Sequence, residues 1–547
     1  MDEAREVYAA WLYLVILEGC CVMGLDALMH GVRLIRQSDR LVRLLARWQM
    51  ARAARVATLV SGMRTTTVSV LVAVSLSACL HTEMPALDTP APAQWRQAYT
   101  TSATQLSAAE TAWWLAFKDP LLNQLMQTAL KQNLTLQQAS ERISYARSLQ
   151  AHELATEKPQ LSLYAGPNSL SRMLAVGNSS SGQSRHAASG AFLAGFDLIW
   201  ELPIFGQGAG QRQITQADLQ IAEADVSSRQ LSLAAELVRV YAELDAAVQR
   251  EKQLALAEAG YANLRTLSNK GVSGGFTSPE TAESFMTEVQ GAQRMRRQNR
   301  LNQEMALQRL AVLCGQAEPT EAWLTELQSR PAGKLAEDVQ SISLPMRVPA
   351  EIIRQRPDIK VAESQVLKAT GALGIAKSDL YPKLSIEGAL MIAGRVTGES
   401  LRHTGSLTYI APSINIPLLD WGLRREVVNQ RESQLREALL AYKEAVLLAI
   451  EETENALVNF NESRAQLLAE EQALSRWQIQ SAKLQRAVDV GYLSKMDVFK
   501  QDMRNQQTLL QYIDAKQAWM RGYAFANKAL SGAVSLNPDQ QATENTQ

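Results

Sequence analysis

Cysteine is scarce in this chain of 547 residues, which holds four of them: Cys20, Cys21, Cys79 and Cys314. No disulfide is possible after Cys79 unless Cys79 itself takes part, so a small disulfide-bonded scaffold is excluded. Cys314 stands alone within a helical pattern, and we interpret it as a small buried hydrophobic residue.

An excess of charge of either sign is also absent, because 55 Lys and Arg residues balance 55 Asp and Glu residues. A net charge of zero argues against a nucleic-acid-binding surface. The chain is too long for one ordinary core, so we expect several domains or one very elongated unit.

The residues that carry covalent or metal chemistry are thinly spread. Gly271-Val-Ser273-Gly-Gly275 matches the G-x-S-x-G pattern of a hydrolase elbow, but a predicted helix rather than a strand precedes it. The only downstream histidine, His403, falls in a predicted loop. No two of the five histidines have i,i+4 spacing, and the sequence has no Cys-x-x-Cys. We therefore predict that the protein is not an enzyme and binds no metal or cofactor.

Glycine and proline are missing from two long stretches, residues 211–259 and 423–490. Each stretch predicts a very long helix, and the second spans roughly 100 Å at 1.5 Å per residue. An apolar seam with heptad spacing runs through the second at Leu435, Leu439, Tyr442, Val446, Ala449, Thr453, Ala456, Phe460, Leu467 and Leu474. This seam predicts partner helices packed side by side.

A glycine-bearing turn follows each long helix, at Lys270–Gly275 and at Val490–Ser494. The helical pattern then resumes and ends near Gly315 and near Gly532. Each half of the chain therefore predicts a helical hairpin.

Two pairs of strand-like segments precede the long helices, at residues 159–163 with 191–200 and at 382–386 with 406–416. Strands of about ten residues suit a tilted membrane crossing. One face of the second segment carries Phe192, Ala194, Phe196, Leu198 and Trp200, as a lipid-facing side should. Four strands cannot close a barrel, and an open sheet edge in lipid is very costly. The chain must therefore combine its strands with those of its own copies, and the count alone leaves two and three copies open.

An export signal is predicted from three adjoining features. Met63-Arg64 is a short basic start, Val68–Leu76 is apolar but too short for a bilayer span, and Leu76-Ser-Ala-Cys79 puts small residues before a cysteine. The pattern resembles a bacterial lipobox, in which a signal peptidase cuts before the cysteine and the thiol carries lipid. It predicts a signal peptide over residues 63–78 and covalent lipid on Cys79, and Leu80 agrees with sorting to the outer membrane.

Residues 1–62 precede this signal and contain an apolar stretch interrupted by Glu18, then a basic stretch. We expect Met63 to be the true initiator, the alternative being an inner-membrane segment. A stretch rich in proline and alanine follows the cysteine and predicts an extended tether over residues 79–107.

Three motifs carry a family resemblance. Trp113-Trp114-Leu-Ala-Phe-Lys-Asp-Pro-Leu121 resembles the opening of outer-membrane efflux lipoproteins of the TolC/OprM/NodT type. Arg354-Gln-Arg-Pro-Asp-Ile359 resembles the Arg-Pro-Asp-Ile motif of that family, and Tyr381-Pro382 resembles its Tyr/Phe-Pro before the third strand. The resemblance covers roughly residues 79–533.

The resemblance implies a mainly α-helical fold with a small β part. Two repeats of a β-hairpin plus a long helical hairpin would occupy residues 108–330 and 331–533, with a tail at 534–547. It implies a homotrimer with a 12-stranded outer-membrane β-barrel and a periplasmic α-helical barrel, in a Gram-negative bacterium. It also implies a periplasmic adaptor protein and a proton-driven inner-membrane pump of the RND type. The protein would be the passive exit duct for drugs or other toxic small molecules.

The resemblance further suggests where the functional residues lie. The family often keeps acidic residues beyond the second turn, around a closed periplasmic aperture. Asp497 fits the first such position, Lys500 stands where a second acid is usual, and Asp502 is close by. We expect the aperture at Asp497 and Asp502.

Both turns cap the helical hairpins at the end away from the membrane. We expect adaptor docking there, at Gly271, Ser273, Gly491 and Ser494.

Two motifs are interpreted as structural. Trp113 and Trp114 are expected to pack rather than bind. Arg356, Pro357 and Asp358 form a structural motif, in which Asp358 is a helix cap or an ion-pair residue.

Two other functions remain to be weighed. An exit duct for type I protein secretion is disfavoured by the lipobox, which secretion ducts of this family commonly lack. A coiled-coil lipoprotein that spaces membrane from wall needs no strands, so the two proline-bounded hairpins argue against it.

Overall fold

The computed structural model divides the chain into two compact units, Met1–Cys79 and Leu80–Gln547. It describes residues 82–87, 92–96, 101–102, 112–167, 190–330, 342–345, 349–397, 400–490, 492 and 495–530. Cys79, the signal at 63–78, the extension at 1–62 and the tail at 534–547 lie outside the described residues, and everything below concerns the second unit.

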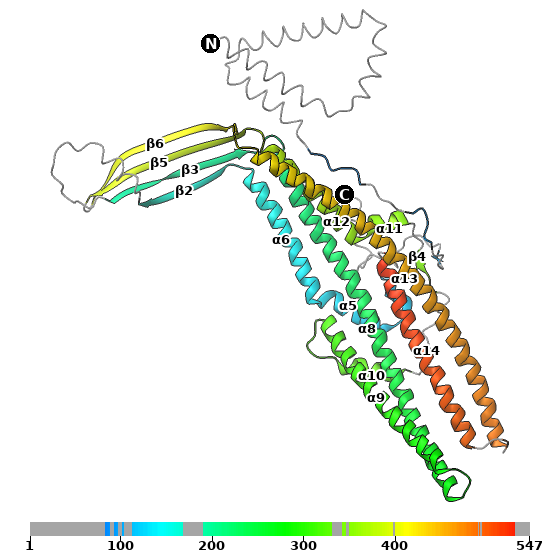
Figure 1. The fold of residues 1–547 in the computed structure, drawn as a ribbon. Coiled ribbons are helices and arrows are strands. Elements are labelled where there is room, and N and C mark those ends of the chain that lie inside the picture. Colours follow the sequence, from blue (N-terminus) through cyan, green and yellow to red (C-terminus); the bar gives the residue numbers. More distant parts are fainter. Residues whose placement is uncertain are drawn as a thin grey trace, which may run out of the picture. The chain divides into compact units, whose positions relative to one another are not determined.

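Two helical hairpins of equal dimensions dominate this unit (Figure 1). Helices α8 (Gln207–Ser273) and α13 (Leu423–Asp489) have 67 residues each. The returning helices α9 (Pro279–Leu313) and α14 (Lys495–Ala529) have 35 each. Equivalent positions of the two hairpins are 216 residues apart (423 − 207, and 495 − 279), which we call the repeat spacing. The predicted pair of helical hairpins is confirmed.

Shorter helices continue the returning helices toward the strands. Helix α6 (Leu134–Thr156) begins where α9 ends, and α12 (Pro357–Ser378) begins where α14 ends. Helix α8 packs against α6 and α9, and also against α12 and α14, whereas α13 packs against α12 and α14 (Figure 1). The unit is therefore a helical wall in which α8 lies inside and α13 lies at one border.

The described part of the wall also contains four short helical segments. They are η3 (Trp113–Phe117), α5 (Pro120–Gln132), α10 (Glu321–Ser329) and α11 (Pro349–Gln355). The Asp119 side chain caps α5 by accepting hydrogen bonds from the backbone of Leu121 and Leu122, at 3.0 and 3.3 Å.

The strands form one antiparallel sheet in the order β2-β3-β5-β6. They are β2 (Gln160–Pro167), β3 (Gly190–Leu202), β5 (Lys383–Thr397) and β6 (Ser400–Asn415). The pairing of β3 with β5 joins the two predicted hairpins, with Trp200 opposite Ile386. A two-residue strand β1 (Thr101–Ser102) also pairs in parallel with β4 (Leu344–Pro345).

The predicted heptad seam of α13 is buried. Val446, Thr453, Phe460 and Leu467 have no exposed surface, because α12 and α14 cover this stripe of the helix. Burying such a stripe supplies the main driving force for packing the long helices side by side.

An aromatic cluster packs η3 against the returning helix α14. Trp113 and Trp114 are 4% and 3% exposed, in agreement with the packing interpretation. Edge-to-face contacts join Phe117 to Trp519 and Tyr523 of α14, with centroid separations of 5.7 and 5.3 Å. Such pairs add to the free energy gained from burial alone.

Parts of the predicted tether lie against the helices. The Gln213 side chain donates to the carbonyl of Thr82 at 3.2 Å, and the backbone of Arg96 donates to Glu454 at 2.7 Å. Met84 and Leu87 pack against the core around α12 and α13. These described parts of 79–107 are thus packed on the wall.

Candidate functional site

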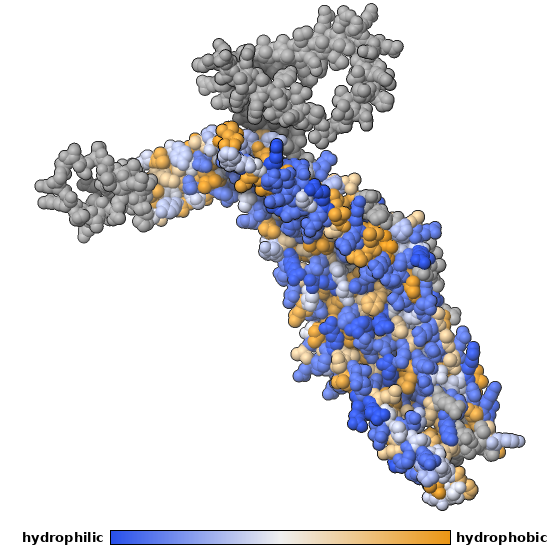
Figure 2. All heavy atoms as spheres, viewed as in Figure 1, coloured by the Kyte–Doolittle hydropathy of each residue, from blue (hydrophilic) through white to orange (hydrophobic). Residues whose placement is uncertain are grey.

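The sheet presents one apolar and one mixed face, as the strand pairing shows. The apolar face carries Leu161, Leu163, Ala194, Phe196, Leu198, Trp200, Ile386, Leu390, Ile392, Ile410 and Ile414. The other carries Gln160, Ser162, Asp197, Glu201, Lys383, Ser385, Glu387, Ser413 and Asn415, beside Ile199, Leu407 and Tyr409. The predicted alternation along β3 is present, and the side chain of Phe192 lies outside the described residues. Figure 2 shows hydrophobic side chains along the strands and mostly hydrophilic ones over the helices.

At the far end of the wall, α8 turns into α9 through a Schellman motif. The amide of Phe276 donates to the Gly271 carbonyl at 2.8 Å, and the amide of Gly275 donates to the Val272 carbonyl at 3.1 Å. Gly275 has a φ of +75°, the left-handed conformation that this motif requires. Gly271 and Ser273 therefore lie in the last turn of α8, not in the connecting turn where the sequence placed them.

Each tip exposes one aromatic side chain. Phe276 is 90% exposed, and Tyr492, one repeat spacing later, is 86% exposed. The amide of Tyr492 donates to Ala487 at 2.8 Å, which matches the Phe276 bond to Gly271. The sequence analysis missed these two residues, although both follow a turn glycine.

Gly491 and Ser494 lie outside the described residues. The repeat spacing pairs them with Gly275 and Ser278 of the first tip, and their part in adaptor docking stays a prediction.

Asp497 and Asp502 both lie in the first part of α14, directly beyond the second tip. Their side chains lie outside the described residues, so their part in an aperture stays a prediction.

Arg356 joins three helices at the level where α14 meets α12. Its guanidinium donates to the last carbonyl of α14, that of Ala529, at 3.0 Å, and pairs with Asp358 at 2.8 Å and with Glu452 of α13. Burial alone lowers the pKa of Arg356, but the two carboxylates outweigh burial and raise the pKa. Asp358 is an ion-pair residue here, and its Oδ1 also accepts the Ile359 amide at 3.0 Å.

Asn133 makes the equivalent joint in the first repeat. It precedes α6, and its amide donates to the carbonyl of Leu313, the last residue of α9, at 3.0 Å. Leu313 and Ala529 are one repeat spacing apart. In both repeats the last carbonyl of the returning helix accepts a hydrogen bond from the residue directly before the helix that stacks on its end. This bond satisfies a carbonyl that a helix end otherwise leaves without a partner.

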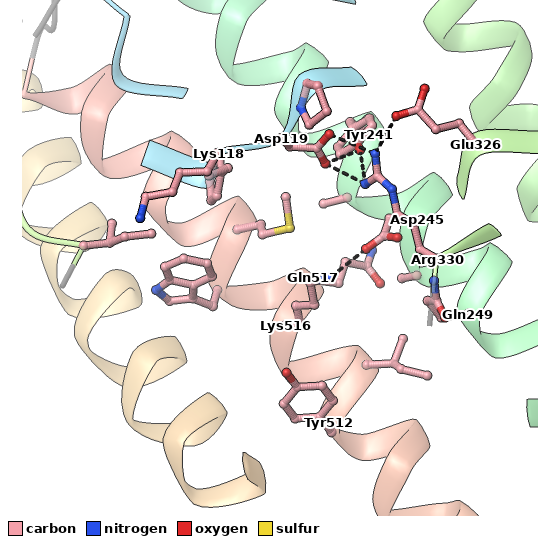
Figure 3. Close-up of a pocket in the computed structure, with 18 of the residues that line it drawn as sticks. Lys118, Asp119, Tyr241, Asp245, Gln249, Glu326, Arg330, Tyr512, Lys516 and Gln517 are labelled. Carbon is pink, nitrogen blue, oxygen red and sulfur yellow. Dashed lines mark hydrogen bonds and ion pairs between the residues drawn. The ribbon is translucent and has the colours of Figure 1, made fainter. Parts of the chain in front are cut away.

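A partly buried polar cluster holds α5, α8 and the end of α10 together (Figure 3). Arg330 donates to Asp119 at 2.7 Å and to the Tyr241 hydroxyl at 2.8 Å, and that hydroxyl donates to Asp119. Burial alone raises the pKa of Asp119, but bonds from Arg330 and Tyr241 hold it below its usual value. Burial and the Asp119 charge raise the pKa of Tyr241 well above 10.

This cluster borders a cavity of about 460 Å³ between α8 and α14. Lys516 of α14 pairs with Asp245 of α8 at 2.9 Å across it (Figure 3). The sequence analysis did not predict the cluster, and only the Asp-Pro helix start at 119 gave a local signal.

The comparisons with known proteins point to one family. The family model described as outer membrane efflux protein matches residues 348–524. Nodulation protein T of Rhizobium leguminosarum bv. trifolii is 26% identical over 82% of this chain and 92% of its own length. The pyoverdine export outer membrane protein OpmQ of Pseudomonas aeruginosa is 26% identical over 80% and 90%.

Solved structures show the same fold. The outer-membrane channel OprN aligns with a TM-score of 0.65 and 25% identity, covering 83% of this chain and 99% of that one. The outer-membrane channel CmeC of Campylobacter jejuni aligns with a TM-score of 0.68 and 19% identity, covering 85% and 97%. Along most of its length the chain is similar to outer-membrane efflux and channel proteins, and it has their fold.

The protein is accordingly an outer-membrane protein of a Gram-negative bacterium with the fold of these channels, and the proteins it resembles are channels rather than enzymes. Its one hydrolase-like motif lies at the end of α8, where the Ser273 hydroxyl donates to the carbonyl of Asn269 at 3.1 Å. Among the described residues, no three His, Cys, Asp or Glu side chains are grouped to hold a metal ion.

Cys314 is a free, buried thiol at the end of α9. Burial raises its pKa to about 11, so it stays protonated and unreactive. None of the helices that the structure describes is both long enough and apolar enough to cross a membrane.

Proposed function

We propose that three copies of this chain form the outer-membrane duct of a tripartite efflux system. The observation that carries the proposal is the four-stranded sheet, in which β2 and β6 are the outermost strands. Exposed strand edges cannot remain unpaired in lipid. Three such sheets, joined edge to edge, would close a 12-stranded barrel whose apolar face meets the bilayer.

The border helix α13 supports the same assembly. Its Leu440 and Leu447 are 68% and 58% exposed. Their counterparts in α8, Ala224 and Leu231, are 5% and 6% exposed, because α8 has neighbours on both sides. A second copy that placed its α6 and α9 against α13 would cover these leucines and extend the wall into a tube.

The tips are the proposed contact with a periplasmic adaptor protein. Each copy presents Phe276 beside Gly271 and Ser273, and Tyr492 beside Gly491 and Ser494 in the sequence. Exposed aromatic side chains are frequent anchors of protein interfaces. The adaptor would connect the duct to an inner-membrane pump of the proton-driven RND type, which supplies the energy.

The aperture behind the tips is proposed to be ringed by Asp497 and Asp502. Three copies of each acid near a common axis would make a negative constriction that favours cations.

The proposed cargo is a drug or another toxic small molecule. Relatives of similar identity bear the names antibiotic efflux pump and toluene efflux pump outer membrane protein. Those names support small-molecule efflux over type I protein secretion.

We also propose that Cys79 carries covalent lipid, on the strength of the lipobox-like sequence before it. Cells fed labelled palmitate should yield labelled protein, and Cys79→Ala should abolish the label. Label that survives this substitution would contradict the lipid anchor without affecting the duct.

Two measurements test the duct. Light scattering of the detergent-purified full chain should give the mass of a trimer, and the protein should conduct ions in liposomes. In a host that lacks its own outer-membrane efflux component, co-expression with a periplasmic adaptor and an RND-type pump should restore drug resistance. A folded monomer that carries no current would overturn the proposal, whereas conductance with restored protein secretion alone would favour the secretion duct.

A further inference from the structure

The connection from sheet to helix has the same unusual backbone in both repeats. Phe205 and Gly206 precede α8 with φ values of 57° and 87°, and Trp421 and Gly422 precede α13 with 55° and 87°. A left-handed aromatic residue is uncommon and costs free energy, so surrounding contacts must hold it in place.

In the first repeat that contact is visible. The Phe205 ring stacks on Tyr381, with centroids 5.2 Å apart and an interplanar angle of 17°. Tyr381 belongs to the second repeat, directly before Pro382 and β5, and β5 is the neighbour of β3. The stack therefore ties one repeat to the next, at the level where strands become helices.

In the second repeat, none of the rings that the structure describes stacks on the corresponding aromatic residue. Trp421 is 91% exposed although its backbone matches that of Phe205. The residue equivalent to Tyr381 in the first repeat is Lys158, which precedes Pro159 and β2. The strand register gives the same equivalence, because Leu161 pairs with Leu198, and Leu384, at the same distance from Tyr381 as Leu161 is from Lys158, pairs with Ile414, one repeat spacing after Leu198.

Trp421 and Lys158 belong to opposite borders of one sheet, because β6 and β2 are its outermost strands. They can meet only between copies. If β6 of one copy lies beside β2 of the next, as β3 lies beside β5, Lys158 of the next copy takes the place that Tyr381 has beside Phe205.

We propose that Trp421 of each copy lies over the Lys158 side chain of the neighbouring copy, as a cation–π contact that fixes the joint between copies. Tryptophan provides the best ring face for an ammonium group, and Lys158 is exposed and free to extend toward it. This inference rests on the proposed trimer. It assigns the contact that sets the register between β6 of one copy and β2 of the next.

Cysteine pairs test the geometry in the full chain. Trp421→Cys combined with Lys158→Cys should give covalent dimers and trimers with a short bismaleimide. The matched pair Phe205→Cys with Tyr381→Cys should link within one chain and leave its mass on a denaturing gel unchanged. The wild type serves as the control for native cysteines.

Failure of the first pair in a sample that light scattering shows to be trimeric would overturn the contact and leave the duct standing. A monomeric wild type would overturn the duct itself.

Dissociation of the oligomer on heating tests the chemistry. Trp421→Ala and Lys158→Gln should each lower the dissociation temperature, and the double variant should lower it no further. Lys158→Tyr should restore the wild-type temperature, because it recreates the pair seen at Phe205 and Tyr381. Additive losses, or no effect of Lys158→Gln, would contradict the contact and indicate that Trp421 instead anchors in lipid headgroups.

Discussion

At the residue scale, Arg356 and Asn133 have the same structural role, although one uses a guanidinium and the other an amide. Each bonds the last carbonyl of a returning helix and starts the helix above it. Arg356 also reaches Glu452 of α13 and is only 6% exposed, so it joins three helices where Asn133 joins two.

Replacing Arg356 with alanine should therefore lower the free energy of unfolding by about 1–3 kcal/mol, because the buried Ala529 carbonyl loses its closer donor and two carboxylates lose their guanidinium partner. Arg356→Lys should recover only part of this, since an ammonium cannot reproduce the forked bonds. The matched control is Lys528→Ala, whose ammonium lies 3.8 Å from the same Glu452 at a more exposed site. Helical circular dichroism during heating in detergent checks this, and equal effects of both alanines would contradict the special role of Arg356.

The depressed pKa of Asp119 predicts a loss of stability in acid. A carboxylate whose folded pKa lies below its unfolded value of about 3.9 stabilises the fold above that value. This contribution disappears as the pH falls through the lower folded pKa. The melting temperature of the wild type should thus drop more steeply than that of Asp119→Asn below about pH 4. Parallel curves for the two proteins would show that the Arg330 pair contributes nothing; Glu326→Gln is the half-exposed control.

At the element scale, the lengths of the long helices can be predicted from the sequence. Which helices pack against them cannot. The stretch free of glycine and proline predicted α13 to within one residue, because nothing in it breaks a helix. Helix α8 extends beyond its predicted bounds through Gly208, Gly210 and Gly260. These glycines are tolerated because packing outweighs their low helix propensity.

Two of these helices approach most closely at a glycine pair. A Cβ on Gly371 of α12 would lie 2.6 Å from the carbonyl oxygen of Gly210 in α8. Gly371→Ala should therefore force the helices apart and cost about 1–3 kcal/mol. On the same helix, a Cβ on Gly374 meets nothing closer than 3.4 Å, so Gly374→Ala should be neutral or gain about 0.5–1 kcal/mol. Thermal melts of both variants decide this, and a tolerated Gly371→Ala would refute the close crossing.

The tip aromatics give a prediction about partners. Phe276→Ser with Tyr492→Ser should weaken binding of the purified adaptor by at least roughly 10-fold, the loss typical of interface anchors. Conductance in liposomes should stay unchanged because the fold is intact. Met295→Ser, which alters an exposed side chain along α9, serves as the control. Unaltered adaptor binding by the tip variant would move the docking surface elsewhere.

The order of the strands could not be predicted from the sequence. Alternation along residues 191–200 revealed the apolar face, because neighbouring residues of a strand point to opposite sides. The pairing of β3 with β5 depends on how two distant helical hairpins pack, and no local pattern records that. The Asp119, Tyr241 and Arg330 cluster escaped notice for the same reason, since its members come from three separate elements.

At the scale of the whole molecule, one repeated design produces a wall with two complementary borders. Helix α13 and strand β6 end the wall on one side, and α6, α9 and strand β2 end it on the other. Copies related by rotation bring unlike borders together, which closes a ring.

The predicted aperture is testable through the current that such a ring carries. Asp497→Asn with Asp502→Asn should reduce the preference for cations, seen as a smaller reversal potential across a salt gradient. Lys500→Gln should shift the reversal potential in the opposite direction. An unchanged reversal potential in both variants would place the narrowest part of the duct elsewhere.

The equal lengths of the two hairpins have a mechanical consequence. Because the helices of the two hairpins have matching lengths of 67 and 35 residues, we expect both tips of a copy to reach the same depth. Three copies would then present six tips at nearly the same level, so a ring of adaptor subunits could contact all six without tilting. Adding a heptad to one hairpin alone would make three of the six tips longer than the other three. Matched insertions in both hairpins would lengthen the helical tube and keep the tips level.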